Sequence, residues 1–589
     1  MPGVTSGAAG PSRARRRKFH VLRLAPGLTL AVFLLPILAG LLGTLLPALG
    51  YLPAAGGASI GWGPLRALLN EPGFATSVRT TLAVGAMSSI LSVAIAIGLG
   101  AWVYHRRWAR HLERLLAPLL AMPHSAIAIG FAFLIAPSGW LVRLVSPGLS
   151  GWAVPPDIAT VGHPSGWPLV AGLLLKEVPY LGLMTLGALG QLPAQAHLSA
   201  ARALGYGSVE GYLKIVLPQI YPQLRLPIYA VLAFSLSVVD VGLILGPGNP
   251  PTLAVLAVRW FAAPDVSHYF PAAAAAILIL VIVSLAILCW TLGERLVCSA
   301  GRSWIERGRR RSLGHLFAGA AGTTGLVLYG LALASILSVV LWSFAQQWRY
   351  PDALPSLWTT GQWALQLTSV AQPVLNTLAV GVLSTLIALV LVVGCLQNET
   401  LRRGSANAVT TRPVGQRSLL LLYLPLLVPQ VAFVFGAQVL LIRLGLDGTL
   451  ASVVGIHLVF VLPYLFLSLA DPWRAFDPRY ARTALSLGAS RSRTFWRVKL
   501  PILLRPILIA CAVAFAVSVG QYLPTLFAGS GRVATLTTEA VTLSAGADRR
   551  VSGVWAMLQS SLPLAGFLLT AWVPWLLVRN RNQGRKGMA

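Results

Sequence analysis

The feature that most constrains this chain is a series of apolar runs, each 18 or more residues long, that recur along its whole length. A helix of about 20 apolar residues crosses a hydrocarbon core of roughly 30 Å. Charged residues make up only 10% of the chain, whereas a soluble domain carries about 25%. The short alternating segments of a transmembrane β-barrel are absent. The sequence therefore predicts an all-α polytopic membrane protein.

The apolar runs predict 12 membrane spans. The first follows basic residues, as in a signal peptide, but it is long enough to span and has no convincing cleavage site, so we expect it to be retained. The expected spans are 27–48, 76–103, 115–136, 168–190, 226–247, 271–292, 317–344, 374–396, 418–442, 450–469, 506–528 and 556–578.

The loop charges predict the orientation, because Lys and Arg accumulate on the cytoplasmic side of a membrane. With the N-terminus inside, 35 of the 45 Lys and Arg residues fall in cytoplasmic segments. We therefore expect both termini in the cytoplasm.

Short motifs recur in the two halves of the chain in the same order. Thr81-Leu-Ala-Val-Gly85 returns as Thr377-Leu-Ala-Val-Gly381, and Pro123-His124 is echoed by Pro429-Gln430. Each half holds six spans and starts on the same side, so the repeats are parallel and their interface is the natural transport path. The expected units are a basic N-terminal segment (1–26), a first repeat (27–297), a basic linker (298–316), a second repeat (317–578) and a basic tail (579–589).

The basic balance of the chain, a net charge of +29, does not indicate nucleic-acid binding, because the basic residues punctuate apolar spans instead of clustering in a solvated domain. No G-x-x-x-x-G-K-[ST] phosphate loop occurs, so we do not expect this chain to hydrolyse ATP alone. Its four cysteines have no metal-ligand spacing, and its nine histidines are scattered. We expect no catalytic residue, metal site or cofactor in this chain.

One amphipathic segment in each half departs from the apolar pattern. Both lie between the fourth and fifth spans of their half, on the expected cytoplasmic side. A glycine can adopt the left-handed conformation that ends a helix, Ser208 and Ser490 are candidate N-caps for the helix that follows, and proline disfavours helix at the residue before it. The residues pair as Gly205 with Gly488, Tyr212 with Phe495, Leu217 with Leu500 and Pro218 with Pro501.

These two segments, 199–218 and 482–501, resemble the EAA motif of permease subunits of binding-protein-dependent ABC importers. That motif is E-A-A, three residues, Gly, nine residues and Ile-x-Leu-Pro; here it is Ser199-Ala200-Ala201 to Pro218 and Arg482-Thr483-Ala484 to Pro501. The leading Glu is absent from both copies. The fused two-half permeases of the thiamine, ferric-iron and polyamine or sulfate type are the most similar form.

The resemblance implies two parallel six-helix repeats in a bacterial inner membrane, with each EAA segment docking on an ATPase subunit as a coupling helix. It also implies two copies of that ATPase, which would bind ATP and Mg²⁺, and a separate substrate-binding protein outside. The alternative for each segment is an interfacial helix lying among lipid headgroups.

Polar residues inside the spans are the candidates for the translocation path, because such residues usually face a cavity or a partner. Matching Phe234 with Phe515 pairs Asp240 with Gln521 at corresponding depths. The other candidates are Lys176, Glu177 and His124, each of which could instead be structural.

One acidic position in a span favours a cation as the substrate, such as thiamine, a metal ion or a polyamine. The alternative function is an ion-coupled secondary transporter, in which Asp240 and Glu177 would form the ion site.

Overall fold

The structure is a computed structural model that describes residues 13–104, 116, 118–308, 314–403, 416–546 and 548–586. Parts of the expected N-terminal segment (1–12), of the third span (115 and 117), of the linker (309–313) and of the tail (587–589) lie outside the described residues.

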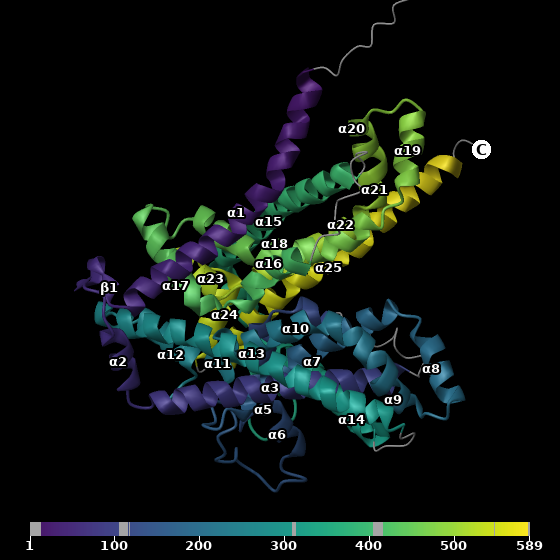
Figure 1. The fold of residues 1–589 in the computed structure, drawn as a ribbon. Helices are drawn as coiled ribbons and strands as arrows, with labels where there is room; N and C mark the ends of the chain where they lie inside the picture. Colours follow the sequence, from purple (N-terminus) through teal and green to yellow (C-terminus); the bar gives the residue numbers. More distant parts are fainter. Residues whose placement is uncertain are drawn as a thin grey trace, which may run out of the picture.

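The first half is built from long helices joined by short ones (Figure 1). The strands β1 (Tyr51–Leu52) and β2 (Gly57–Ala58) pair antiparallel after the first helix. The helices are α1 (Arg13–Ala48), α2 (Gly63–Leu69), α3 (Phe74–Tyr104), α5 (His124–Ile135), α6 (Trp140–Val145), α7 (Trp167–Gly190), α8 (Ala194–Ala203), α9 (Ser208–Gly211), α10 (Leu217–Ser237), α11 (Asp240–Leu245), α12 (Leu253–Phe261) and α13 (Tyr269–Glu306).

The second half repeats this order. The strands β3 (Ala345–Gln347) and β4 (Leu357–Trp358) again follow the first helix of the half. The helices are α14 (Gly314–Phe344), α15 (Gly361–Arg403), α16 (Gln416–Leu427), α17 (Gln430–Arg443), α18 (Leu450–Arg474), α19 (Pro478–Ser486), α20 (Arg491–Thr494), α21 (Leu500–Ile502), α22 (Leu504–Val519), α23 (Leu523–Gly529), α24 (Leu536–Ser544) and α25 (Arg549–Lys586).

Nine of the described helices are long and apolar enough to cross a membrane, and a bent pair, Arg491–Ile502 with Leu504–Val519, makes a tenth span if it is taken as one. The nine correspond to nine of the expected spans, and the bent pair overlaps the expected span 506–528 only through α22, because Arg491–Ile502 belongs largely to the EAA-like segment 482–501. The two others are assembled from shorter pieces: 226–247 from α10 and α11, and 418–442 from α16 and α17. Pro429 stands at the second break and disfavours helix at the residue before it. Twelve spans remain a prediction.

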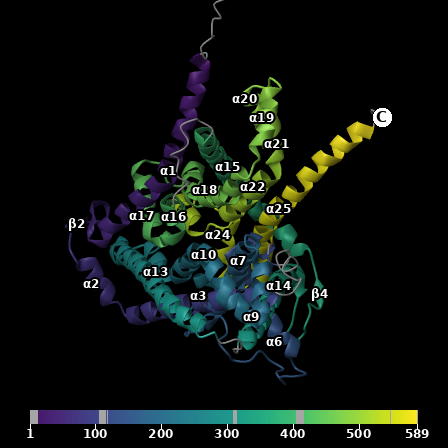
Figure 2. The same cartoon turned by 45° about the vertical axis from the view of Figure 1, so that its right-hand side comes forward.

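The first long helix of each half packs on the opposite half. Helix α1 lies along α17 and also contacts α15 and α18, as both ribbon views show (Figures 1 and 2), while α14 lies against α5, α3 and α25. Small residues allow the backbones to approach closely: a Cβ at Gly40 would collide with the Phe433 carbonyl, and one at Gly130 with that of Ser335. The Gly436 amide donates to Thr44 Oγ1 at 3.0 Å. Each half is therefore held by a helix of the other.

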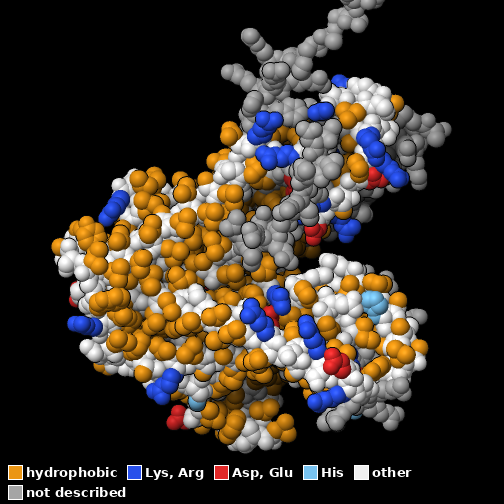
Figure 3. Space-filling model, in the orientation of Figure 1, with side chains coloured by type: hydrophobic (Ala, Val, Ile, Leu, Met, Phe, Trp, Pro, Cys, Tyr) orange, Lys and Arg blue, Asp and Glu red, His pale blue; other side chains and the backbone are white. Residues whose placement is uncertain are grey.

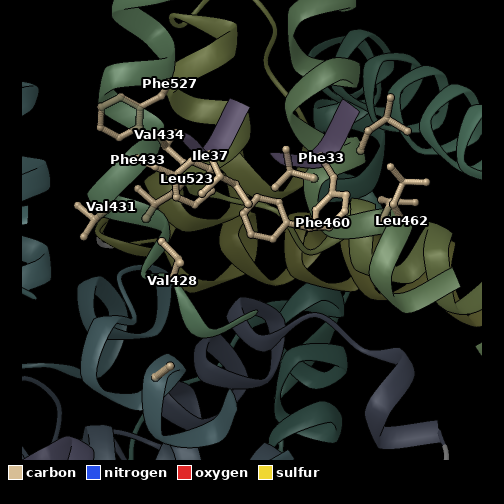
Figure 4. Close-up of a cluster of buried hydrophobic side chains, with 14 of the residues drawn as sticks. Phe33, Ile37, Val428, Val431, Phe433, Val434, Phe460, Leu462, Leu523 and Phe527 are labelled. Carbon is tan, nitrogen blue, oxygen red and sulfur yellow. The ribbon is translucent and has the colours of Figure 1, made fainter. Parts of the chain in front are cut away.

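The side chains of α1 complete a buried apolar cluster of the second half. Phe33 and Ile37 lie among Phe433, Phe460 and neighbouring aliphatic residues (Figure 4), and all four are nearly inaccessible to solvent. These side chains are buried because α1 packs against the second half. The sequence of α1 alone does not specify that packing.

The internal repeat is visible in equivalent hydrogen bonds. The Leu253 amide donates to Thr81 Oγ1, and the Leu536 amide donates to Thr377 Oγ1, both at 2.9 Å. Thr81 and Thr377 begin the repeated motif of the sequence. Leu253 and Leu536 open α12 and α24, helices of equal length, so these two short helices are equivalent.

Candidate coupling segments and transport path

The two EAA-like segments have the same backbone. Gly205 and Gly488 both adopt the left-handed conformation, with φ of +84° and +83°. A one-turn helix, α9 or α20, follows each glycine, and a π-helical turn follows that helix, at Tyr212–Val216 and at Phe495–Lys499. The expected helix, glycine break and second helix are thus present in both halves.

The N-cap expectation holds for one segment and is wrong for the other. Ser490 caps α20, and its hydroxyl accepts the amide of Arg493 at 3.2 Å. In the first segment the cap position is Gly207, and Ser208 is the first residue of α9. With Gly205 set against Gly488, Ser490 aligns with Gly207, so the two serines are not equivalent.

The first segment is packed into the body of the protein. The Tyr212 side chain is fully buried, with its ring centroid 5.8 Å from that of Tyr104. Lys214 lies over the rings of Trp304 and Tyr206, at 4.5 and 5.3 Å, and its Nζ donates to the Trp304 carbonyl at 3.3 Å. Trp304 belongs to the C-terminal end of α13, so this helix fixes the segment.

The second segment is far more exposed. No residue of α19 is buried. Phe495 is half-buried against Trp473, and Trp496 is 65% exposed. Lys499 lies 4.2 Å from the Trp473 ring and donates to Gln397 Oε1 at 3.1 Å. Pro218 and Pro501 are exposed in both copies, and Leu217 and Leu500 are half-buried.

Both segments lie toward the right-hand side of Figure 1, with α19 and α20 above and α8 and α9 below. The space-filling view shows a notch on this side between the two lobes that carry them (Figure 3). A pair of protein subunits could therefore contact both segments from one side.

Lys176 is explained by packing within the first half. Its Nζ donates to the carbonyls of Leu119, Leu120 and Met122, at 2.8, 3.3 and 2.6 Å. Pro123 lies at a break in the helix just after these carbonyls, so no backbone amide of a following helical turn donates to them. Lys176 thus stabilises a broken helix end.

Glu177 joins three helices of the same half. Its carboxylate accepts the Ser92 hydroxyl of α3 at 2.6 Å and also the Ser235 hydroxyl of α10. Lys176 and Glu177 are adjacent in sequence and make separate contacts. Their geometry supports a structural role for both charges.

The equivalent helix of the second half, α18, holds a buried polar residue that the sequence reasoning missed, about one turn before the position that matches Glu177. His457 of α18 is buried, with Nδ1 2.8 Å from Ser518 Oγ and Nε2 2.9 Å from Thr525 Oγ1. Ser518 lies 3.2 Å from Ser384 of α15. A polar residue of the fourth span thus ties its half together in both repeats. A histidine inside an apolar run was the available signal.

The remaining path candidates meet where helices are broken. The His124 ring, at the start of α5, lies 4.8 Å from the ring of Phe234. Gln521 lies between α22 and α23, and its Oε1 accepts from Gln430 Nε2, at the start of α17, at 3.4 Å. Asp240, which opens α11, interacts electrostatically with Tyr522 of the opposite half. The Asp240–Tyr522 interaction thus joins the two halves.

The expected pairing of Asp240 with Gln521 is wrong by two residues. The equivalent helices α11 and α23 begin at Asp240 and Leu523. The pairing of Leu253 with Leu536 gives the same register, which sets Gln521 against Val238. Matching Phe234 with Phe515 caused the shift, because in this register Phe234 stands against Val517. Both polar residues still lie at the same helix break.

Among the described residues, no group of three His, Cys, Asp or Glu side chains could hold a metal ion.

Comparison with known proteins identifies the family. The family model described as "Binding-protein-dependent transport system inner membrane component" matches twice, at residues 90–292 and 406–579, together more than half of the chain. The chain is 34% identical over 502 residues to the inner membrane ABC transporter permease protein YnjC of Escherichia coli K12, covering 85% of this chain and 87% of that protein.

More distant relatives are permeases of named transport systems. The thiamine transport system permease protein ThiP of Escherichia coli K12 is 26% identical over 74% of this chain and 77% of its own length. The molybdenum transport system permease protein ModB of Mycobacterium tuberculosis is 35% identical over 20% of this chain and 49% of its own length. The chain therefore belongs to the family of binding-protein-dependent transport system inner membrane components, as two family repeats fused in one ABC transporter permease.

Proposed function

We propose that this chain forms both halves of the membrane pathway of an ATP-driven importer in a bacterial inner membrane. Two copies of an ATPase subunit, each binding ATP and Mg²⁺, dock on the segments 205–218 and 488–501 from the cytoplasm. A substrate-binding protein delivers the solute from outside, and both termini are cytoplasmic.

The observation that carries this proposal is the duplicated geometry of the two segments. Gly205 and Gly488 share the left-handed conformation, and the π-helical turns begin seven residues after each glycine. A lipid-surface helix needs an apolar face and basic residues but no such fixed turn. Two identical turns fit two copies of one protein partner better than they fit a lipid surface.

For the substrate, the carboxylate of Asp240 beside the helix breaks favours a small cation, such as thiamine, a metal ion or a polyamine. The names of the relatives include thiamine and molybdenum transport systems. These names differ in substrate, so they do not select one for this chain.

The experiment is uptake into proteoliposomes that hold the chain with its ATPase and binding protein. We expect uptake to require ATP on the ATPase side and to continue when ion gradients are collapsed with ionophores. Uptake that needs a gradient and no ATP would establish the ion-coupled alternative. The ion-coupled alternative needs Glu177 beside Asp240 as an ion ligand. Both Glu177 carboxylate oxygens instead accept serine hydroxyls, which argues against that role.

A further inference from the structure

The contacts between the two halves include two equivalent interfaces that differ in their aromatic and polar side chains. One interface brings α12 and α13 of the first half against α17 and α23 of the second. The other brings α5 and α11 of the first half against α24 and α25 of the second. The repeat makes these interfaces equivalent, so each residue of one has a counterpart in the other.

The aromatic interface consists of Phe261, Tyr269, Phe435 and Phe527. The Phe261 and Phe435 rings, from opposite halves, stack with centroids 4.0 Å apart. Phe527 and Tyr269 meet this pair edge-on, with centroids 5.8 Å from Phe261 and 5.6 Å from Phe435. The counterparts of these four residues in the other interface are Ser544, Ser552, Ile129 and Ile244.

The amide interface consists of Ser125, Thr537 and Gln559. Gln559 Nε2 donates across the halves to Ser125 Oγ at 2.7 Å and within its own half to Thr537 Oγ1 at 2.8 Å. Gln559 is fully buried, and its Oε1 has no hydrogen-bond donor among the described residues. The counterparts in the aromatic interface are the buried apolar residues Val431, Ala254 and Ala276.

Separation of these interfaces has different consequences for contact with water. Parting the aromatic interface would expose stacked apolar rings, which is unfavourable in proportion to the area exposed. Parting the amide interface breaks the Gln559–Ser125 hydrogen bond, whose amide and hydroxyl can then bond to water, while the Gln559–Thr537 bond stays within its half. It also gives the Gln559 oxygen a partner that it lacks when the interface is closed, and a buried unpaired acceptor is itself unfavourable.

We propose that the hydrated passage opens along the amide interface during transport, with Gln559 as the residue on which the halves part, while the aromatic interface stays closed. This inference rests on the proposed function, because the motion needs the ATPase partners. The passage is then one-sided, although the fold is built from two equivalent repeats.

The first test measures the access of water-soluble maleimide to single cysteines in the complete complex with its ATPase. Cys289, Cys298, Cys395 and Cys511 are first replaced by Ser. Gln559→Cys is compared with the matched Ala276→Cys, each without nucleotide and trapped with ATP and vanadate. We expect the labelling rate at 559 to change by about tenfold or more between the two states, and the rate at 276 to stay low in both.

The second test joins each interface with a short bismaleimide. Ser125→Cys with Gln559→Cys joins the amide interface, and Val431→Cys with Ala276→Cys joins the aromatic one. We expect the first cross-link to abolish uptake and the second to preserve it, with the uptake of each variant compared before and after cross-linking. Equal labelling at 559 and 276, or loss of uptake from both cross-links, overturns the inference. A complex that lacks bound ATPase from the start instead contradicts the proposed function.

Discussion

The two EAA-like segments share a backbone but differ in what surrounds them. Both turn at a left-handed glycine and continue through a π-helical turn. Tyr212 in the first is fully buried, whereas Phe495 at the same position in the second is only half-buried. The local Gly-to-Pro frame therefore sets the path of the chain, and the neighbouring helices set how firmly that path is held.

The neighbour that makes the difference is the C-terminal part of α13. Glu294 of this helix accepts from the Tyr221 and Tyr229 hydroxyls, at 2.8 and 3.2 Å, and pairs with Arg225 at 3.0 Å. The counterparts of these three partners in the second half are Leu504, Ala512 and Leu508, which cannot bind a carboxylate. The first segment is thus fixed to its half, while the second projects from its own (Figure 1).

The largest expected effects come from charged substitutions at Phe495 and Tyr212, which distinguish loss of ATPase docking from loss of folding. Phe495→Asp places a charge on a half-exposed docking face, so we expect the ATPase to be lost from the purified complex while the chain still inserts and stays folded. Tyr212→Asp removes a buried ring and buries a carboxylate, which costs about 3–5 kcal/mol. We expect this variant to lose thermal stability as well as ATPase.

Co-purification and a thermal unfolding scan in detergent distinguish these outcomes. Leu149→Asp is a suitable surface control, since Leu149 is 87% exposed in the loop between α6 and α7, outside both segments. If ATPase remains bound to Phe495→Asp, docking on this segment is wrong. If Tyr212→Asp unfolds no earlier than Phe495→Asp, the difference in burial between the segments has no energetic meaning.

A smaller effect on stability is expected from the Glu294 contacts that hold the first segment to its half. Glu294→Gln removes the charge that Arg225 pairs with and weakens two tyrosine hydrogen bonds, so we expect the free energy of unfolding to fall by about 1–3 kcal/mol. The matched variant is Glu399→Gln, which breaks the Glu399–Arg474 pair of the second half, whose side chains are 21% and 24% exposed. Partly exposed pairs contribute about 0–1 kcal/mol. Equal losses from the two variants, measured by thermal unfolding, would remove the basis for calling the first segment the fixed one.

The sequence alone could predict the features that depend on residue type and spacing within one segment. Apolar run length located the spans, and the recurring motifs located the two repeats. The Gly-to-Pro spacing predicted two turned segments, because a left-handed glycine and a proline constrain the backbone wherever they stand. The register of that frame also exposes the error at Ser208, which was chosen by residue type instead of by alignment with Ser490.

Contacts between distant segments could not be predicted in the same way. Nothing in the apolar pattern of α1 says that Phe33 packs on the opposite half, because lipid and protein interior are equally apolar environments. Lys176 was a path candidate as an ionisable residue in a span, but carbonyls 54 to 57 residues away in the chain account for it. Gln559 and His457 were missed because a neutral polar side chain hardly alters the apolarity of a run.

The smallest expected effect tests the feature that the two segments share. An alanine in the left-handed conformation is strained by about 1–2 kcal/mol relative to glycine, so Gly205→Ala and Gly488→Ala should each lower the free energy of unfolding by that amount. No atom lies within 4 Å of a Cβ added at Gly488, so its cost is conformational and not steric. Equal losses in thermal unfolding mean that the turn is intrinsic to the frame and independent of burial. A clearly larger loss at Gly205 would mean that α13 and the surrounding helices hold the first turn in place, whereas the second could relax its glycine at little cost.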